Sequence, residues 1–157
     1  MSHDITFYQE NKVCKLPFPP PHGGTYCPDD NFYEAWLNIT YNYSNIFAKH
    51  GLSIIKREKK ERGVHILEGK TASECVKILT SVIPKLGNDT DPDYWKATEG
   101  NAKRSLVHLL MIAVSVPSDA ICHVSQRCLE IVHTIFSDCK PCVACIFILH
   151  VLDFLLT

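Results

Sequence analysis

Apolar positions recur at helical spacing between residues 71 and 86. Thr71 is followed by Glu74, the spacing of a capping box in which each side chain bonds the other residue's backbone N–H. The apolar positions on one side of this stretch are Cys75, Val76, Leu79, Val82, Ile83 and Leu86. The pattern predicts a helix with one buried face, which Pro84 and Gly87 bring to an end. Cys75 is therefore assigned to the core rather than to nucleophilic chemistry.

A second helical pattern covers residues 99–116. One side carries apolar residues, namely Ala102, Leu106, Leu109, Leu110 and Ala113, and the opposite side carries Asn101, Ser105, His108 and Ser115. Thr98 is the expected N-cap, and Glu99 and Lys103 are expected to form a surface ion pair one turn apart. Gly100 lowers the helix propensity of the first turn, which predicts that another segment approaches this turn closely.

Three stretches predict strands. Residues 4–8 alternate apolar and polar positions, residues 35–43 are rich in aromatic and β-branched residues, and residues 120–124 are expected to add a third strand. In the second stretch, Ala35, Leu37, Ile39 and Tyr41 are expected on the core face, with Trp36, Asn38, Thr40 and Asn42 on the other. Four prolines and two glycines in residues 16–24 predict an irregular loop, with a polyproline ligand as the alternative.

Two shorter segments complete the pattern. Residues 44–49 predict a short helix with Ser44 as its N-cap and Gly51 after its end. Residues 56–62 carry five basic and two acidic side chains. We favour a solvated hairpin tip or helix turn for this run. The alternative is a phosphate-binding patch, but the run has no interleaved aromatic residue and is therefore a weak signal for nucleic-acid binding.

These elements predict an α+β fold in which a small antiparallel sheet packs against two or three main helices. The chain has 157 residues, which suits one core better than two, and residues 1–121 are expected to form a single domain. Residues 122–157 are expected to form a cysteine-rich, apolar helical extension packed on the domain or on a second chain. Twelve of the fourteen residues 143–156 are apolar, whereas a membrane span needs about 20.

Composition narrows the class of protein. Hydrophobic residues make up 46% of the chain and charged residues 21%, and the net charge is -1, so neither nucleic acid nor membrane is an expected partner. The first ten residues are polar and mixed, without the basic and then apolar pattern of a secretory signal. We therefore expect a cytoplasmic protein with reduced cysteines.

Five of the eight cysteines lie between residues 122 and 145. Cys139, Cys142 and Cys145 form a CxxCxxC run, whose spacing lets thiolates converge on zinc or on an iron–sulfur cluster. A complete site needs a fourth ligand, for which Cys128, His133 and His150 are the candidates. The alternatives are a redox pair at residues 139 and 142, or cysteines without a ligand.

The segment 91–104 combines two large aromatic residues, both signs of charge, an amide and a glycine at the start of the second main helix. This density predicts a binding surface formed with the exposed face of the strand at 35–43. Its candidate residues are Trp36, Asn38, Thr40, Asn42, Tyr94, Trp95, Glu99, Asn101 and Arg104. The alternative is that Tyr94 and Trp95 fill the edge of the core and that Asn101 caps a loop.

Three blocks carry a resemblance, at residues 23–26 (GGTY), 37–44 (LNITYNYS) and 93–104 (DYWKATEGNAKR). They resemble a family of small uncharacterised proteins of bacteria and their phages. The resemblance covers most of residues 1–121 and implies a shared fold, but it brings no activity, substrate or cofactor. Residues 56–62 look like a local insertion relative to that family, and residues 122–157 extend beyond it.

The sequence thus predicts a small, soluble, non-enzymatic binding protein with a protein or a small molecule as its ligand. A metal-binding protein is one alternative, and a hydrolase or transferase using Glu99, His108 or His65 as acid or base is another. No P-loop, nucleophile elbow or zinc-protease motif occurs in the sequence. A pocket lined by Asn42, Tyr94, Glu99 and Asn101 would favour a small-molecule ligand, and a filled surface would favour a structural role.

Overall fold

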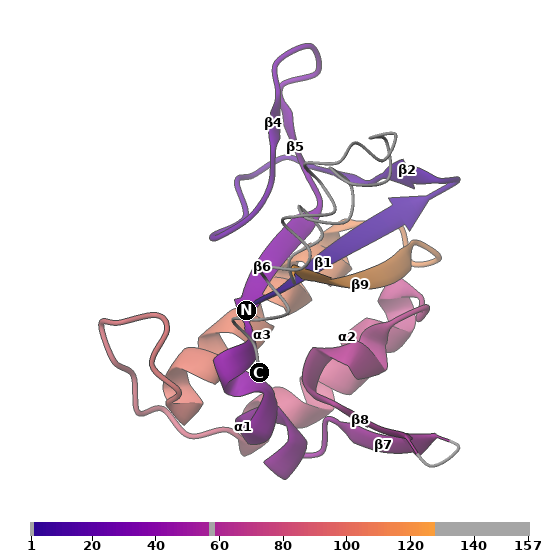
Figure 1. Cartoon of the computed structure of the whole chain (residues 1–157). Coiled ribbons are helices and arrows are strands. Elements are labelled where there is room, and N and C mark those ends of the chain that lie inside the picture. Colours follow the sequence, from indigo (N-terminus) through magenta and orange to yellow (C-terminus); the bar gives the residue numbers. More distant parts are fainter. Residues whose placement is uncertain (1, 57–58, 128–157) are drawn as a thin grey trace, which may run out of the picture. The chain divides into compact units, whose positions relative to one another are not determined.

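Strand β1 (Ser2–Gln9) is the centre of the main sheet (Figure 1). It pairs antiparallel with β6 (Trp36–Thr40) along one edge, from Ser2 opposite Thr40 to Thr6 opposite Trp36. Along its other edge it pairs antiparallel with β9 (Ile121–Arg127). The short strand β2 (Lys12–Val13) folds back on the end of β1 as a hairpin. The strands predicted near residues 4–8 and 120–124 are therefore confirmed, and the structure places them side by side in the sheet.

The computed structural model describes residues 2–56 and 59–127, and the side chains of residues 2–53 and 63–125. The remaining elements are β3 (Lys15–Leu16), β4 (Tyr26–Cys27), β5 (Phe32–Glu34), the 3-10 turn η1 (Tyr41–Tyr43), α1 (Ser44–Lys49), β7 (Ser53–Lys56), β8 (Lys59–Arg62), η2 (Gly63–Leu67), α2 (Ala72–Val82), η3 (Ile83–Lys85) and α3 (Glu99–Ser115). Strands β3, β5 and β4 form a second antiparallel sheet, which the sequence did not predict, and β7 and β8 form a hairpin.

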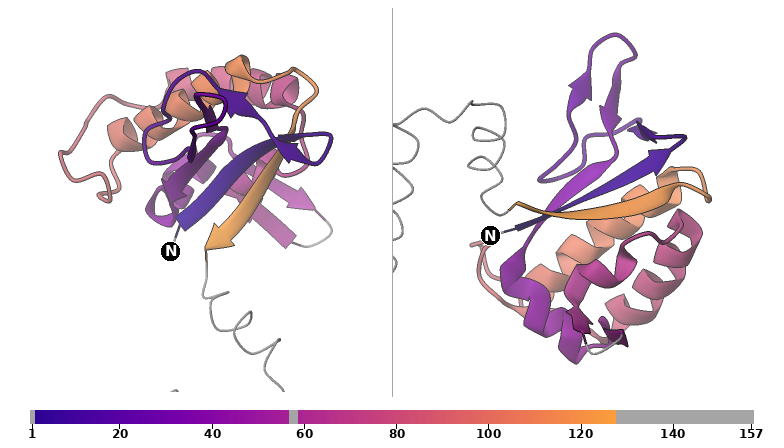
Figure 2. Two further views of the ribbon diagram at one scale, coloured as in Figure 1. Left: turned by 90° about the horizontal axis from the view of Figure 1, so that it is seen from above. Right: turned by 45° about the vertical axis from the view of Figure 1, so that its right-hand side comes forward.

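Helices α2 and α3 cover one face of the main sheet (Figure 2). His3, Ile5 and Phe7 are buried and alternate along β1 with half-buried residues, as a strand with one covered face requires. The apolar residues of the helices that complete this core are Cys75, Leu79, Val82, Ala102, Leu106, Leu109, Ile112 and Ala113. The predicted α+β class is thereby confirmed: an antiparallel sheet packs against the main helices.

Both main helices begin where the sequence predicts. At α2, the Thr71 hydroxyl accepts from the Glu74 N–H, and the Glu74 carboxylate accepts from the Thr71 N–H, so the capping box is complete. Helix α1 has the predicted bounds, and Gly51 follows it with φ of 107°. The prediction that Ser44 is the N-cap of α1 is wrong, because η1 leads directly into α1 and Tyr43 precedes its first turn.

The predicted strand at 35–43 ends earlier than expected. The Thr40 hydroxyl accepts a hydrogen bond from the Asn42 N–H at 3.3 Å and starts the 3-10 turn, so the alternation of faces stops there. Thr40 is consequently buried, with 1% of its surface exposed, whereas Tyr41 is 47% exposed. The expected assignments of Thr40 to the exposed face and of Tyr41 to the core face are both wrong.

Strand β9 continues past the domain boundary expected at residue 121. All of its residues from Ile121 to Arg127 pair with β1. Residues 1–127 form one compact unit. The predicted helical extension and its CxxCxxC run lie outside the described residues. Within the described part, no helix is long and apolar enough to cross a bilayer.

Candidate binding site at the start of helix α3

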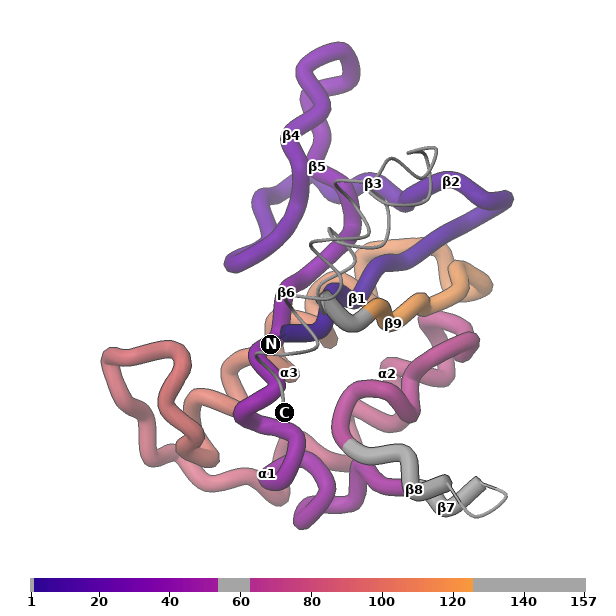
Figure 3. The backbone as a smooth tube through the Cα atoms, in the orientation of Figure 1, coloured from indigo at the N-terminus to yellow at the C-terminus, as the bar shows by residue number. Residues whose placement is uncertain are grey.

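Residues 87–98 form the loop that leads into α3, and this loop extends away from the helices (Figure 3). Thr98 is the N-cap, and its hydroxyl accepts from the Asn101 N–H at 3.2 Å, as predicted. The Gly100 N–H donates to the Asp89 carbonyl at 3.1 Å. A Cβ on Gly100 would lie 2.6 Å from the carbonyl carbon and oxygen of Asp89. The predicted close approach to this turn is therefore made by the loop itself.

Asn101 is the central anchor of the loop. Its Oδ1 accepts from the Asp91 N–H at 3.1 Å, and its Nδ2 donates to the carbonyls of Asp93 at 2.9 Å and Lys96 at 3.3 Å. Only 1% of its surface is exposed. The expected position of Asn101 on the polar side of the helix is therefore wrong. Ser105 is also buried and donates to the Ala102 carbonyl within the helix. The segment 91–96 buries Asn101 because its backbone supplies every partner of the amide.

The segment that follows strand β6 holds the same loop from the other side. The Tyr43 hydroxyl donates to the Tyr94 carbonyl, and Asn42 Nδ2 donates to the Trp95 carbonyl at 2.8 Å. Together with the two bonds from Asn101, these place a side-chain donor on each of the four consecutive carbonyls of residues 93–96. Burial, followed by the nearby Tyr94 and Asp93, raises the pKa of Tyr43 to about 12, which keeps its hydroxyl protonated and able to donate.

Tyr94 joins the loop to the sheet. Its hydroxyl donates to the Asn38 carbonyl at 3.1 Å, and its ring packs at 80° against the ring of Tyr43. On its other side His22 stacks on Tyr94, with ring centroids 4.1 Å apart and planes 28° apart. Burial raises the pKa of Tyr94. Tyr94 therefore has the structural role that was weighed as the alternative, and it fills the edge of the core.

His22 is a member of this site that sequence reasoning missed. It has φ of 59°, and its carbonyl accepts from the Asn38 N–H at 2.9 Å. The next residue, Gly23, bridges Leu37, and a Cβ there would lie 2.1 Å from the Trp36 carbonyl oxygen. In the sequence, the pair of glycines after His22 indicates only a loop. It is in fact the means by which this segment lies against the edge of β6.

Trp95 lies at the outer surface of the anchored loop. The residue is 54% exposed, and its ring meets the Tyr94 ring edge to face at 5.5 Å. Its backbone N–H donates to the Asp93 carboxylate at 3.0 Å, and Lys96 forms an ion pair with Asp91. The backbone beneath Trp95 is thus fixed on both sides while the indole remains open to solvent.

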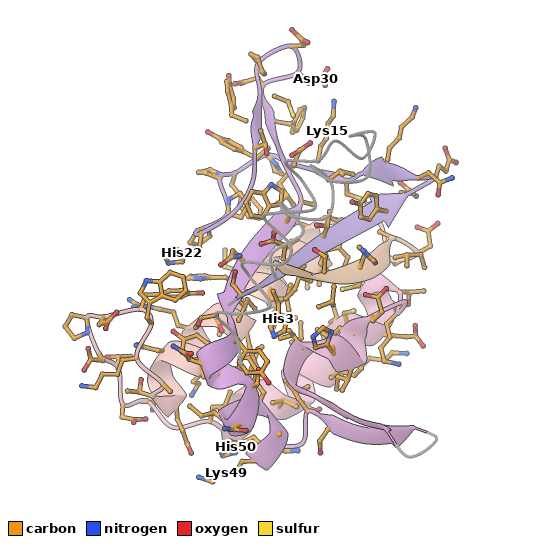
Figure 4. The ribbon with its side chains drawn as sticks, viewed as in Figure 1. His3, Lys15, His22, Asp30, Lys49 and His50 are labelled. Atoms are coloured by element: carbon orange, nitrogen blue, oxygen red, sulfur yellow. The ribbon has the colours of Figure 1, made fainter. Side chains whose placement is uncertain are left out.

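Glu99 does not pair with Lys103 as predicted. Its carboxylate accepts from Lys49 Nζ, His50 Nε2 and the Gly87 N–H, each at 2.9 Å. Figure 4 shows Lys49 and His50 together at the end of α1. Lys103 instead donates to the Leu86 carbonyl and to Asn88. The bonds from Lys49, His50 and Gly87 lower the pKa of Glu99 to about 2, so this carboxylate is ionised and occupied at neutral pH.

Arg104 is exposed one turn further along α3 and makes no hydrogen bond or ion pair with any described residue. It lines a shallow groove of about 290 Å³ with Asn88, Thr90, Gly100, Lys103 and Val107. Burial lowers the pKa of His108, and the positive charges of His22 and Arg104 lower it further. Of the predicted site residues, only Arg104 lines this groove. The amides, Tyr94 and Glu99 are occupied by internal bonds.

The remaining predicted residues lie elsewhere on the sheet. Trp36 Nε1 donates to the Thr25 hydroxyl at 3.3 Å, and Asn38 Nδ2 donates to the Ser2 hydroxyl at 2.9 Å and to Asp4. Trp36 and Asn38 share the face of the sheet opposite the helices, but Thr40 does not. The strand face and the loop are therefore connected through Asn38 and Asn42 rather than forming one continuous surface.

The candidate acid and base residues do not form a catalytic pair. Glu99 is bound by α1 and Gly87, and His65 packs against the ring of buried His3, with centroids 4.5 Å apart. No group of three or more His, Cys, Asp or Glu side chains in the described part is arranged to hold a metal ion. Comparison with known proteins adds no assignment, because no family model, curated protein or solved structure matches the chain.

Proposed function

We propose that the protein is a non-catalytic interaction module that binds another protein through the loop at residues 87–98, with Trp95 as the anchor. One observation carries the proposal. Four consecutive carbonyls beneath Trp95 each accept a side-chain hydrogen bond, yet Trp95 itself is 54% exposed. A backbone fixed before binding loses little conformational entropy on association, so the binding energy of the exposed side chain is retained.

The chemistry of the residues supports a protein partner. Tryptophan and arginine are the side chains most enriched among the residues that dominate protein–protein binding energy. Trp95 offers an exposed indole, and Arg104 has no ionic partner among the described residues. The groove beside Arg104 is shallow, and Asn42, Tyr94, Glu99 and Asn101 do not line it. A filled surface with one large exposed side chain suits a protein contact better than it suits a small ligand.

The enzymatic alternative receives no support from this geometry. A general acid or base needs a pKa near the working pH, and the pKa of Glu99 is lowered to about 2.

Metal binding by the CxxCxxC run and assembly through the tail stay predictions, as does kinship with bacterial and phage proteins. A cytoplasmic location also stays a prediction.

Site-specific photo-crosslinking in the cells that make the protein tests the proposal. A benzophenone amino acid replaces Trp95 in one variant and Tyr26 in a matched control, since Tyr26 is 48% exposed on the β4–β5 hairpin. We expect irradiation to give one adduct of defined mass from position 95 and none of that mass from position 26. No adduct at position 95, or the same adducts from both positions, would overturn the proposal.

A further inference from the structure

Two cysteine side chains meet in the core between α2 and β9. Cys75 and Cys122 are both fully buried, with 0% of their surface exposed, and both are free thiols. Their side chains are hydrogen-bonded to each other. The two other described cysteines are not in such contact: Cys14 is buried, and the Cys27 thiol donates to the Thr25 carbonyl at 3.7 Å. The thiol pair is used by nothing in the proposed binding site.

The backbone holds the two sulfur atoms in place. The Gly69 N–H donates to the Cys122 carbonyl at 2.9 Å, and the Cys122 N–H donates to the Lys70 carbonyl at 2.8 Å. The segment that makes these bonds leads directly into α2, where the Cys75 N–H donates to the Thr71 carbonyl at 2.9 Å. Lys70, whose carbonyl binds the Cys122 N–H, is therefore separated from Cys75 by only four residues of the chain. Such a frame limits how far the sulfur atoms can separate.

The hydrogen bond makes the two thiols unequal. Donation from Cys122 lowers the pKa of Cys75 against the opposing effect of burial, and Lys70 lowers it further. The same contact with Cys75, followed by burial, raises the pKa of Cys122. The first thiolate to form is therefore that of Cys75, and a thiolate is the species that reacts with oxidants.

We propose that Cys75 and Cys122 are a modification site at which a peroxide forms an intramolecular disulfide between α2 and β9. The Cys75 thiolate attacks one peroxide oxygen, the O–O bond breaks, and hydroxide leaves, which gives a sulfenic acid on Cys75. Cys122 Sγ then attacks Cys75 Sγ, the S–O bond breaks, and the hydroxyl leaves with the Cys122 proton as water. Both sulfur atoms are oxidised, and one peroxide is reduced to two waters.

The pair lies behind one exposed backbone segment. Gly69 is exposed, and the space where its Cβ would lie has no neighbour within 4 Å. Its N–H is bonded to the Cys122 carbonyl, so one backbone segment separates that residue from solvent. Because neither thiol is exposed, we expect local opening of this segment to admit a small oxidant such as hydrogen peroxide more readily than a bulky disulfide reagent.

Peptide mapping gives a direct test, because trypsin releases the two cysteines on separate peptides. Residues 71–77 contain Cys75 alone and residues 105–127 contain Cys122 alone. Folded full-length protein is treated with hydrogen peroxide, its remaining thiols are alkylated, and the digest is analysed by mass spectrometry without reduction. We expect a linked species equal to both peptides less two hydrogens, which dithiothreitol converts back to the separate peptides.

Three variants sharpen the result. Cys75→Ser and Cys122→Ser are expected to abolish the linked species, and Cys122→Ser to accumulate a dimedone-reactive sulfenic acid at Cys75. Cys27→Ser is the matched control and is expected to leave the yield unchanged. The proposal is overturned if folded wild-type protein leaves both peptides as free thiols while Cys27 is oxidised. It is also overturned if the linked species forms only in urea. Both outcomes are read on wild-type protein, so they hold even if a serine variant fails to fold.

Discussion

Asn101 and His3 are polar side chains buried to the same degree, with 1% of the surface of each exposed, but their surroundings differ. Asn101 lies at the start of α3, and its amide bonds the backbone at three positions of the loop. His3 lies in β1 beneath Tyr41 and His65, and both of its ring nitrogens lack a hydrogen-bond partner in the described structure. Burial alone therefore does not tell whether a polar residue stabilises a fold.

The difference lies in what each residue supports. The Asn101 amide takes the place of water as the hydrogen-bond partner of loop backbone groups that no helix or strand pairs. It therefore allows an irregular loop to be rigid. His3 gives up its hydration and receives only ring contacts in return, which costs free energy. Hydrogen bonds consequently hold the loop at 87–98 firmly in one conformation, whereas the region around His3 is a less stable part of the core. Four measurements test this contrast.

The largest effect is expected from Asn101→Ala. The change leaves the Asp91 N–H and the carbonyls of Asp93 and Lys96 without their partner, and we expect a loss of about 3 kcal/mol in the free energy of unfolding. Urea denaturation followed by circular dichroism measures it. Asn88→Ala is the matched control, because Asn88 is an exposed amide of the same loop and its loss should cost less than about 0.5 kcal/mol. Equal effects of the two changes would refute the anchoring role of Asn101.

Acid should act on the His3 region. Burial, and then the charge of His65, lowers the pKa of His3 from 6.5 to about 4, with Asp4 acting in the opposite direction. The unfolded chain binds a proton below pH 6.5 that folded His3 takes up only near pH 4. Stability is therefore complete above pH 6.5 and falls as the pH drops toward 4, by about 2 kcal/mol at pH 5.

His3→Leu separates this effect from the other titrating groups. The variant should lose the His3 part of the pH dependence between 6.5 and 4, and at pH 7 it should be as stable as the wild type or more so, because no unpartnered nitrogen remains. Urea midpoints at pH 7 and pH 5 for both proteins measure this. A pH profile that matches that of the wild type would mean that His3 is not the group responsible.

Gly100→Ala is a test in which helix propensity and packing predict opposite signs. Alanine in a helix is favoured over glycine by about 1 kcal/mol, so propensity alone predicts a more stable protein. A Cβ at this position would lie 2.6 Å from the Asp89 backbone, so we expect a loss of about 1 to 2 kcal/mol and a displaced loop. Thermal denaturation gives the sign. A raised melting temperature would show that residues 89–90 move aside without cost.

The sequence could predict the elements whose signals are local. The capping box of Thr71 and the cap of Thr98 were foreseen, since each depends on residues within a few positions of one another. The glycine itself predicted a close approach to Gly100, but it did not identify Asp89 as the neighbour. The partners of Glu99 were not foreseen, because Lys49 and His50 are 50 and 49 positions away. Propensity favours Lys103 as the partner, and only the packing of α1 against the loop decides otherwise.

The candidate site divides in the same way. The sequence alone identifies the residues that a helix start does not need for capping or packing, namely Tyr94, Trp95, Gly100, Asn101 and Arg104. Which of them faces outward depends on hydrogen bonds that cross the fold, such as those from Asn42 to Trp95 and from Tyr94 to Asn38. The stack of His22 on Tyr94 joins two segments without any shared sequence signal.

Trp95→Ala should have the smallest effect on stability and so makes the sharpest contrast with Asn101. The loop carbonyls keep their donors when the indole is removed, since Asn42, Tyr43 and Asn101 bond the backbone rather than the ring. The edge-to-face contact with Tyr94 is lost, and we expect a cost of less than about 1 kcal/mol by urea denaturation. A crosslinker placed at exposed Lys96 should nonetheless lose its adduct in this variant, because the anchor is gone while the loop remains. A loss of stability as large as that of Asn101→Ala would show that the indole supports the loop, and Trp95 would then be a structural residue rather than a binding one.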